Sequence, residues 1–441
     1  MKSKHTIRST FRKEFSNWRI WSARGVVMAF AALAGLSVVG FTALSDLAFA
    51  WFESLYGWQW WTPLVWTPLC TAAIVWLTRR YVAGAAGSGI PQVMAALEPA
   101  VAPQHQGLFV SLKLSIAKVL LTTWGLLAGL SLGREGPSVQ VAAGVMLAAR
   151  RWLPERSAVT AHGLLVAGGA AGIAAAFNTP LGGIMFAIEE LSRTPEQRSS
   201  GLLMAAIVLA GLMAVSINGN ATYFGLIHIA GVDLSLVLPG LAVAILSGLA
   251  GGLFSRLLLA SLSAAPRDWF GRLRQRRPVL FAAGCGLAVA VIGLCSGGAI
   301  FGSSYSHTRA MLAGSGQTPA AFFFMKFIAT WLTSWSGVPA GIFAPSLAIG
   351  AALGNDVAQL LHSPHASALI ALGMVGFLAA ATQAPLTAFI IVMEMVDGHA
   401  MVLSLMACAM VARTVSHVLS PPLYANLAQA QALRLPASAT R

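Results

Sequence analysis

The sequence predicts an all-α integral membrane protein made of two related halves. Of its 441 residues, 57% are hydrophobic and only 10% are charged, and the mean hydropathy is +0.74. A soluble protein of this length would need more polar surface than these residues supply. Two further observations refine the prediction: the chain resembles itself at a fixed spacing, and glycine and proline together interrupt its apolar stretches at three places.

Apolar stretches long enough to span a bilayer recur along the chain. A membrane-spanning helix needs about 20 apolar residues, and the stretches 25–50 and 108–130 meet this length. The stretches 138–149 and 345–361 are shorter, so we expect them to form partial or broken helices. The first stretch is too long for a signal peptide, and the basic segment 1–24 precedes it. We therefore expect a multi-pass membrane protein that keeps its first span.

The net charge of +14 is concentrated in two clusters that adjoin predicted spans. By the positive-inside rule we expect both clusters, and both termini, in the cytoplasm. Nucleic-acid binding is the alternative explanation of basic clusters, and their position beside spans disfavours it. Residues 1–24 are thus predicted to form a basic cytoplasmic segment, and residues 428–441 a cytoplasmic tail. The clusters comprise Lys2, Lys4, Arg8, Arg12, Lys13, Arg19 and Arg24 at the N-terminus, and Arg267, Arg272, Arg274, Arg276 and Arg277 in one loop.

Residues 25–217 and 218–427 are predicted to form two membrane repeats, because segments of the first half match segments of the second at shifts of 205 and 208 residues. Transporter folds built from two repeats bind substrate at the repeat interface, where interrupted helices direct their ends. A duplication that only supports a helical bundle is the alternative. The matches include Pro180 with Pro385 and Glu189 with Glu394 at the first shift, and Gly133 with Gly341 and Pro137 with Pro345 at the second.

Three short segments combine glycines with a proline at a predicted helix start. Proline suits the first turn of a helix, and glycine lets the backbone approach a ligand closely. The free N–H groups and the dipole at a helix N-terminus favour anions. Three such starts in one membrane protein predict helix N-termini that converge on a single anion, whereas a proline kink or plain turn is the alternative for each. The segments contribute Gly87, Gly89 and Pro91; Gly133, Gly136 and Pro137; and Gly341 and Pro345.

Glu135 lies inside the second of these segments, next to Arg134. A charged side chain at the centre of a bilayer helix costs about 2.5–3.5 kcal/mol even on the insertion scale. The carboxyl group must therefore be paired, exposed to water in a pathway, or protonated part of the time. Each possibility predicts a functional role for Glu135.

The three segments read Gly-Ser-Gly-Ile-Pro, Gly-Arg-Glu-Gly-Pro and Gly-Ile-Phe-Ala-Pro in chain order, and Tyr424 follows near the end of the apolar region. With these motifs the chain resembles the CLC family of chloride channels and proton-coupled chloride exchangers over residues 25–427. The resemblance implies a fold of two inverted-topology repeats of tilted and broken helices. It also implies a homodimer with a separate ion path in each subunit.

The resemblance assigns a role to each group near the predicted anion. The hydroxyls of Ser88 and Tyr424 and the main-chain N–H groups of Ile342 and Phe343 would bind a central chloride. Neutral donors suit a pathway, because an ion must bind well enough to enter and weakly enough to leave. Arg134 is therefore expected to brace local backbone rather than bind chloride.

Glu135 would be the gate, since an ionised carboxylate competes with chloride for one positive site and a protonated side chain can swing away. Coupling also needs an acid on the cytoplasmic side. The family's exchangers place an inner proton-transfer glutamate at Glu190, where channels usually have an apolar residue. A surface acid at a helix end is the alternative for Glu190. Neighbouring residues on a helix point about 100° apart, so Glu189 is interpreted as a structural carboxylate.

The sequence thus predicts a secondary active transporter, a proton-coupled chloride antiporter gated by Glu135, and a passive chloride channel of the same family is the alternative. A membrane enzyme is disfavoured, because the carboxylates are isolated and lack histidine partners. We expect chloride and protons as substrates, contact with membrane lipid, no cofactor, no metal and no nucleic acid. The chain ends soon after Tyr424, without the nucleotide-binding pair of eukaryotic relatives, which favours a bacterial inner-membrane protein. Gln92 replaces a glutamate that many relatives have. The transport rate, the stoichiometry and the preference among chloride, nitrate and fluoride stay open at this level.

Overall fold

The computed structural model describes residues 18–155, 157–192, 200–219, 222–224, 234–263, 268–314, 319 and 321–433. Within these ranges the chain is helical, and the β-structure is one isolated antiparallel bridge between Gly133 and Gly341. The predicted all-α class is confirmed. The predicted cytoplasmic residues Lys2, Lys4, Arg8, Arg12, Lys13 and Arg267 lie outside the described residues, as does most of the predicted tail.

The helices of the first half recur in the same order in the second half. A π-helical turn, Ala187–Leu191, follows α8, and the helices α11 and α19 have no counterpart in the first half. The first half contains α2 (Trp18–Trp58), α3 (Thr62–Tyr81), α4 (Ile90–Leu97), α5 (Leu112–Leu127), α6 (Glu135–Ala148), α7 (Ala161–Phe177), α8 (Pro180–Phe186) and α9 (Ser200–Asn218). The second contains α10 (Val237–Leu262), α11 (Trp269–Arg276), α12 (Pro278–Cys295), α13 (Tyr305–Leu312), α14 (Phe322–Ser336), α15 (Phe343–Leu360), α16 (Ala366–Thr382), α17 (Pro385–Met395), α18 (Val402–Leu419) and α19 (Leu423–Ala432).

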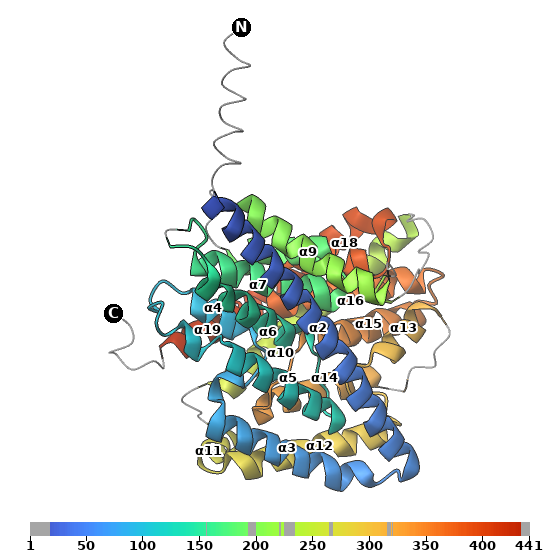
Figure 1. Ribbon diagram of the computed structural model, residues 1–441. Coiled ribbons are helices and arrows are strands. Elements are labelled where there is room, and N and C mark those ends of the chain that lie inside the picture. The colour runs from blue at the N-terminus through green and yellow to red at the C-terminus, as the bar shows by residue number, and fades with distance from the viewer. Residues whose placement is uncertain are drawn as a thin grey trace.

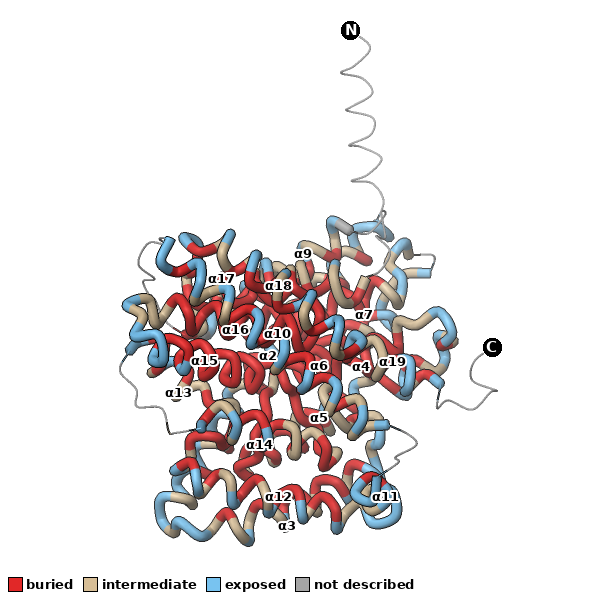
Figure 2. Tube along the Cα trace, turned by 180° about the vertical axis from the view of Figure 1, so that it is seen from behind, coloured by how far each residue is buried: buried red, intermediate tan, exposed pale blue. Residues whose placement is uncertain are grey.

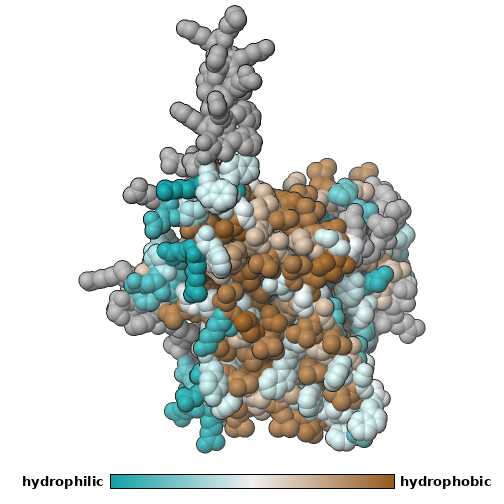
Figure 3. Space-filling model, in the orientation of Figure 1, coloured by the Kyte–Doolittle hydropathy of each residue, from teal (hydrophilic) through white to brown (hydrophobic). Residues whose placement is uncertain are grey.

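Among the residues that the structure describes, five helical segments are long and apolar enough to cross a membrane. At 1.5 Å per residue the 41-residue α2 is about 60 Å long, roughly twice the hydrocarbon thickness, so it must lie tilted. It runs diagonally across the molecule in Figure 1, and apolar side chains cover the middle of the surface in Figure 3. The five segments are Trp18–Trp58, Gln106–Leu127, Leu234–Leu262, Pro278–Cys295 and His399–Leu419.

The helices α6 and α15 are not among these spans, as the short stretches at 138–149 and 345–361 predicted. Both are almost wholly buried at the centre, packed against α7 and α16 respectively (Figure 2). Small residues permit this packing, because they let helix backbones approach closely. A Cβ atom on Gly350 or Gly373 would meet the carbonyl oxygen of the other glycine. The corresponding Gly168 is equally tight against Ala143 of α6.

Two buried lysines show that the halves share one architecture. Lys118 of α5 donates to the carbonyl oxygens of Ala85 and Gly87, both at 2.7 Å, ahead of α4. At the corresponding position, Lys326 of α14 donates to two carbonyl oxygens ahead of α13, those of Ile300 at 2.9 Å and Gly302 at 2.8 Å. The helices α4 and α13 nevertheless lie at opposite sides of the molecule (Figure 1). The two repeats are therefore inverted relative to each other.

Candidate functional site

The three glycine and proline segments meet at the centre of the molecule. The N–H of Gly133 donates to the carbonyl oxygen of Gly341 at 2.8 Å, and the N–H of Gly341 donates back to Gly133 at 3.0 Å. The first segment joins the third: Gly87 donates to Val338 at 3.3 Å and accepts from Ala340 at 3.2 Å. The three segments therefore meet as predicted, and the anion on which they would converge stays a prediction.

This convergence depends on glycine at specific positions. A Cβ atom at Gly136 would collide with the hydroxyl of Ser88, and one at Gly341 would lie 2.7 Å from the carbonyl oxygen of Gly133. Gly89 adopts a φ of 107° and would place a Cβ 2.7 Å from the carbonyl oxygen of Gly136. Larger residues would therefore separate the segments. The three prolines, Pro91, Pro137 and Pro345, lie in the first turns of α4, α6 and α15, as predicted.

Glu135 begins α6, and its carboxylate lies at the N-terminus of α15 in the other half. The residue is 1% exposed, and its Oε2 accepts a hydrogen bond from the N–H of Ala344 at 3.3 Å. Its Oε1 is buried without a hydrogen-bond partner among the described residues. A Cβ on Gly133 would collide with Oε2, so the carboxylate fits only because residue 133 is glycine. The first N–H groups of a helix lack intrahelical partners, and here a carboxylate of the other half occupies one of them.

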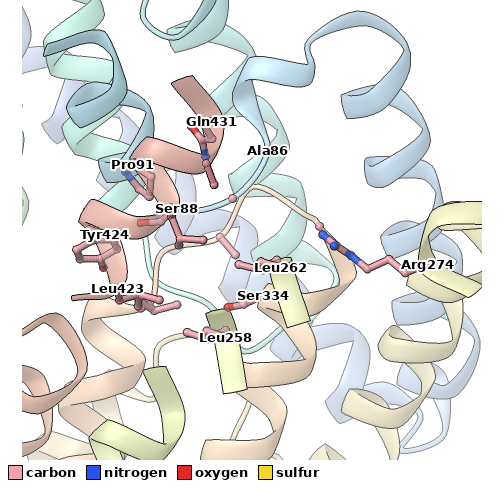
Figure 4. A pocket seen from close by; sticks show the side chains of 16 residues that line it. Ala86, Ser88, Pro91, Leu258, Leu262, Arg274, Ser334, Leu423, Tyr424 and Gln431 are labelled. Carbon is pink, nitrogen blue, oxygen red and sulfur yellow. The ribbon is translucent and has the colours of Figure 1, made fainter. Parts of the chain in front are cut away.

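Ser88 and Tyr424 meet beside a cavity of about 170 Å³, here called the α19 pocket, which Ile342, Leu423 and Gln431 also line (Figure 4). The two hydroxyls are buried and close enough to interact, but neither makes a hydrogen bond of ordinary geometry in the described part of the chain. Unpaired buried hydroxyls cost free energy unless a ligand or water satisfies them.

The predicted main-chain donors lie at the same place. Ile342 is the N-cap of α15 and Phe343 its first residue, so their N–H groups belong to those that a helix leaves without intrahelical partners. The ring of Phe343 stacks on Tyr424 with 6.1 Å between centroids and 13° between planes. The structure thus brings all four predicted chloride-binding residues together, and their neutral donors suit an anion.

Arg134 differs from its prediction. Its guanidinium donates from Nη1 to the carbonyl oxygen of Thr42 at 3.2 Å and pairs with the carboxylate of Asp46. Both partners belong to α2, so Arg134 fixes α6 to the first helix rather than bracing the backbone of its own segment. No local sequence pattern indicated the contact between Arg134 and Asp46, because the two residues are 88 positions apart.

A second cavity of about 570 Å³ opens beside Arg134 and Asp46, and is here called the α13 pocket. Tyr223, Ser303 and His307 also line it. No pattern in the sequence predicted this cavity. Glu135 lies between the two cavities, because its neighbour Arg134 lines one and the α15 N-cap, Ile342, lines the other.

The two adjacent carboxylates after α8 have different surroundings. Glu189 accepts hydrogen bonds from the N–H groups of Leu386 at 3.1 Å and Thr387 at 2.7 Å, at the start of α17. These contacts agree with its interpretation as a structural carboxylate. Glu190 is half-buried in the π-helical turn and interacts electrostatically with the hydroxyl of Tyr424.

Glu394 repeats the contacts of Glu189 in the opposite direction. Its carboxylate accepts from the N–H groups of Leu181 at 3.3 Å and Gly182 at 2.8 Å, at the start of α8. Glu189 of the first half therefore caps α17 of the second, and Glu394 of the second half caps α8 of the first. The two glutamates occupy equivalent positions of the repeat, 205 residues apart.

Gln92 has a structural role that its sequence position did not reveal. Its Oε1 accepts from the N–H of Gly89 at 2.9 Å, and its amide donates to the carbonyl oxygen of Ala86. The side chain thus closes the loop that presents Ser88. No cluster of three or more potential metal-ligating His, Cys, Asp or Glu residues occurs in the ranges that the structure describes.

Comparisons with known proteins identify a family and several relatives with similar sequences. A family model described as "Voltage gated chloride channel" matches residues 70–417. The H(+)/Cl(-) exchange transporter ClcA of Salmonella paratyphi A (strain ATCC 9150 / SARB42) is 31% identical over 365 residues, covering 80% of this chain and 75% of that protein. The ClcA exchanger of Citrobacter koseri is 30% identical over 367 residues, with the same coverage of 80% and 75%.

Solved structures show that the fold is shared. A slow cyanobacterial Cl-/H+ antiporter superposes with a TM-score of 0.79 at 24% identity, covering 94% of this chain and 98% of that one. A CLC-type fluoride/proton antiporter superposes with a TM-score of 0.77 at 22% identity, covering 92% and 98%.

Proposed function

The chain belongs to the voltage-gated chloride channel family, and we propose that it is an antiporter that exchanges chloride for protons across a membrane. The observation that supports this most is the position of the Glu135 carboxylate at the N-terminus of α15. That position favours an anion. The protein fills it with its own titratable group, next to a cavity that holds the unpaired hydroxyls of Ser88 and Tyr424.

Competition for this position would couple the two ions. Chloride arriving from the α19 pocket and the ionised carboxylate carry the same charge, so each raises the free energy of the other near the start of α15. Protonation removes the charge of Glu135 and with it the attraction to the helix N-terminus. The side chain then turns away and chloride passes, and loss of the proton restores the closed arrangement.

Glu190 is the second proton-transfer group in this proposal. Its carboxylate interacts electrostatically with Tyr424, which lines the α19 pocket, and Tyr424 also interacts with Glu135. Protons would move between the two glutamates while chloride moves past Ser88 and Tyr424. The curated relatives at 30–31% identity are named as exchangers, which favours this function over the passive channel.

The orientation and assembly belong to the same proposal. Arg274 lines the α19 pocket, and the neighbouring Arg272, Arg276 and Arg277 belong to or adjoin α11. The positive-inside rule then favours a cytoplasmic α19 pocket and cytoplasmic termini. The proposal includes the inner membrane of a bacterium, because the relatives at 30–31% identity come from Salmonella and Citrobacter. We further propose a homodimer in the lipid bilayer, with one ion path in each subunit, and crosslinking in native membranes tests it.

Purified protein in liposomes tests the transport function. A chloride gradient is imposed while chloride and pH are recorded together in the same sample. We expect protons to move against their own gradient, driven by chloride. Chloride flux without uphill proton movement would instead establish the passive channel, and Glu135→Gln provides the uncoupled control.

A further inference from the structure

The inverted repeat gives Tyr424 a counterpart on the opposite side of the molecule. A shift of 201 residues, which follows the correspondence of α9 with α18, places Tyr223 on Tyr424. A shift of 215 residues, which superposes α4 on α13, places Ser88 on Ser303. Ser88 and Tyr424 line the α19 pocket, while Ser303 and Tyr223 line the α13 pocket. The two cavities are thus built from equivalent parts.

The same repeat relates Glu135 to Phe343, at a shift of 208 residues. Phe343 points toward its tyrosine and stacks on Tyr424 at 6.1 Å. Glu135 does not take the equivalent direction, because its carboxylate turns to the N–H of Ala344. The direction that Phe343 takes in its own half would bring Glu135 toward Tyr223.

One hydrogen bond and two ring contacts fix the position of Tyr223. The hydroxyl of Tyr305 donates to the carbonyl oxygen of Tyr223 at 2.7 Å, and the two rings pack edge to face with centroids 5.1 Å apart. Phe177 packs on the ring of Tyr223 at 5.6 Å and on the ring of Phe343 at 6.2 Å. One aromatic layer therefore links Tyr223 to the start of α15, where Glu135 lies.

The hydroxyl of Tyr223 is available for a partner. It interacts electrostatically with Arg134 and Glu135, and the side-chain hydrogen bond found at Tyr223 in the described ranges goes to its main-chain oxygen rather than to this hydroxyl. A phenol can donate to the carbonyl oxygen of a carboxylic acid or accept from its O–H.

The charge of the α13 pocket favours a neutral acid. Asp46 and Glu53 both line it, and Arg134 is already paired with Asp46. An ionised carboxylate would be repelled by the remaining negative charge, whereas a protonated carboxyl group would not. The charged or titratable groups that surround Glu135 and Tyr223 are Asp46 and Glu53 of α2, Arg134 beside α6, Tyr305 and His307 of α13, and, on the opposite side, Glu190 and Tyr424.

We propose that the Tyr223 hydroxyl is the hydrogen-bond partner of the Glu135 side chain when that side chain is protonated and turned toward the α13 pocket. Tyr223 is then a positioning residue that stabilises the open, protonated arrangement. This inference rests on the proposed gating role of Glu135. It extends that role by naming the group that receives the side chain.

Tyr223→Phe removes only the hydroxyl, so it tests the proposal with little risk to folding. Chloride flux is measured in liposomes with the same pH on both sides, from pH 4 to pH 8. A net hydrogen bond contributes about 0.5–1.5 kcal/mol, and one pH unit corresponds to about 1.4 kcal/mol. Losing the partner of the protonated form should move the half-maximal pH down by about 0.4–1 unit and lower the flux at neutral pH by about twofold to tenfold.

Two controls separate this role from a structural one. In a Glu135→Ala background no carboxyl or amide group remains for the hydroxyl to contact, so adding Tyr223→Phe should change the flux by less than about twofold. Tyr424→Phe, the equivalent change in the other half, should weaken chloride binding instead of moving the pH profile.

An unchanged pH profile in Tyr223→Phe would overturn the inference, and so would an equal loss of flux in the Glu135→Ala background. The antiporter proposal fails separately, if the parent protein moves no protons uphill. Even then, an acid shift of the chloride flux in Tyr223→Phe would support the contact with Glu135, because protonation also opens a channel gated by that residue.

Discussion

The α19 and α13 pockets are equivalent parts of two inverted repeats, yet their chemistry differs. The α19 pocket has the neutral hydroxyls of Ser88 and Tyr424, with Arg274 as a lining charge. The α13 pocket has Asp46 and Glu53 on its wall, and its arginine is already paired. One backbone scaffold therefore presents neutral donors to an anion on one side and acidic groups suited to protons on the other.

The residues at the equivalent helix starts explain this difference. Phe343 begins α15 and packs on Tyr424, whereas Glu135 begins α6 and crosses to the N-terminus of α15. The phenyl ring of Phe343 has a single form and favours one apolar environment. The carboxyl group of Glu135 has an ionised and a protonated form, and the two forms favour different environments. The carboxyl group at this one of the two equivalent helix starts therefore makes the arrangement sensitive to protons.

Removing the charge of Glu135 should have the largest effect on transport, because neither α6 nor α15 would then begin with a titratable side chain. Glu135→Gln should abolish proton coupling and most of the pH dependence while chloride still permeates. The neutral amide can neither compete as an anion nor exchange a proton. Paired chloride and pH recordings in liposomes check this, and residual coupling in the variant would show that another group is the gate.

The next largest effect separates the two neighbouring acids. Glu190→Val should abolish proton transport and keep chloride flux, because only the proton route from the α19 side is lost. Glu189→Gln is the matched control, since that carboxylate is engaged by Leu386 and Thr387. It should keep the coupling of the parent. The opposite pattern would reverse the assignment within the pair.

Chloride affinity should respond more moderately to the α19 pocket. Ser88→Ala and Tyr424→Phe each remove one neutral donor worth about 0.5–1.5 kcal/mol, which corresponds to about twofold to tenfold weaker binding. Calorimetric chloride titration of each variant measures this. Ser303→Ala, at the equivalent position of the α13 pocket, should leave the affinity as it is in the parent. Equal weakening by Ser303→Ala would contradict the distinction between the pockets.

The smallest effect, on the free energy of unfolding, is expected from the helix-capping carboxylates of Glu189 and Glu394. Glu189→Gln and Glu394→Gln each remove the charge that accepts two N–H groups at a helix start, so both should lower the free energy of unfolding by about 1 kcal/mol. Thermal unfolding in detergent should show similar shifts for the two variants, because their contacts are equivalent. A large shift in only one would show that the halves do not share this contribution.

Much of this arrangement could be predicted from local patterns. Proline in the first turn and glycine before it marked the starts of α4, α6 and α15, and the shift that aligned Glu189 with Glu394 identified two residues with equivalent contacts. These features depend on neighbouring residues or on direct similarity. The shortness of α6 was also visible, because too few apolar residues follow Pro137 for a complete span.

The rest depends on contacts between distant segments. Nothing near Arg134 indicates that its guanidinium reaches Asp46, and nothing near Glu189 indicates that it caps α17. Tyr223 was overlooked because its similarity to Tyr424 covers a single residue, and only the superposed helices before each tyrosine reveal the correspondence. The role of Lys118 in fixing the loop before α4 could not be predicted either, because its partners are main-chain carbonyl oxygens, which any residue provides.

Proton uptake on chloride binding tests the central claim most directly. If chloride and the Glu135 carboxylate compete for the N-terminus of α15, binding of chloride displaces the carboxylate and favours its protonation. Chloride titration calorimetry in buffers of different ionisation enthalpy gives the number of protons taken up per chloride. The account predicts uptake of a measurable fraction of one proton near neutral pH in the parent, and none in Glu135→Gln. Chloride binding without proton uptake in the parent, or with equal uptake in Glu135→Gln, would contradict it.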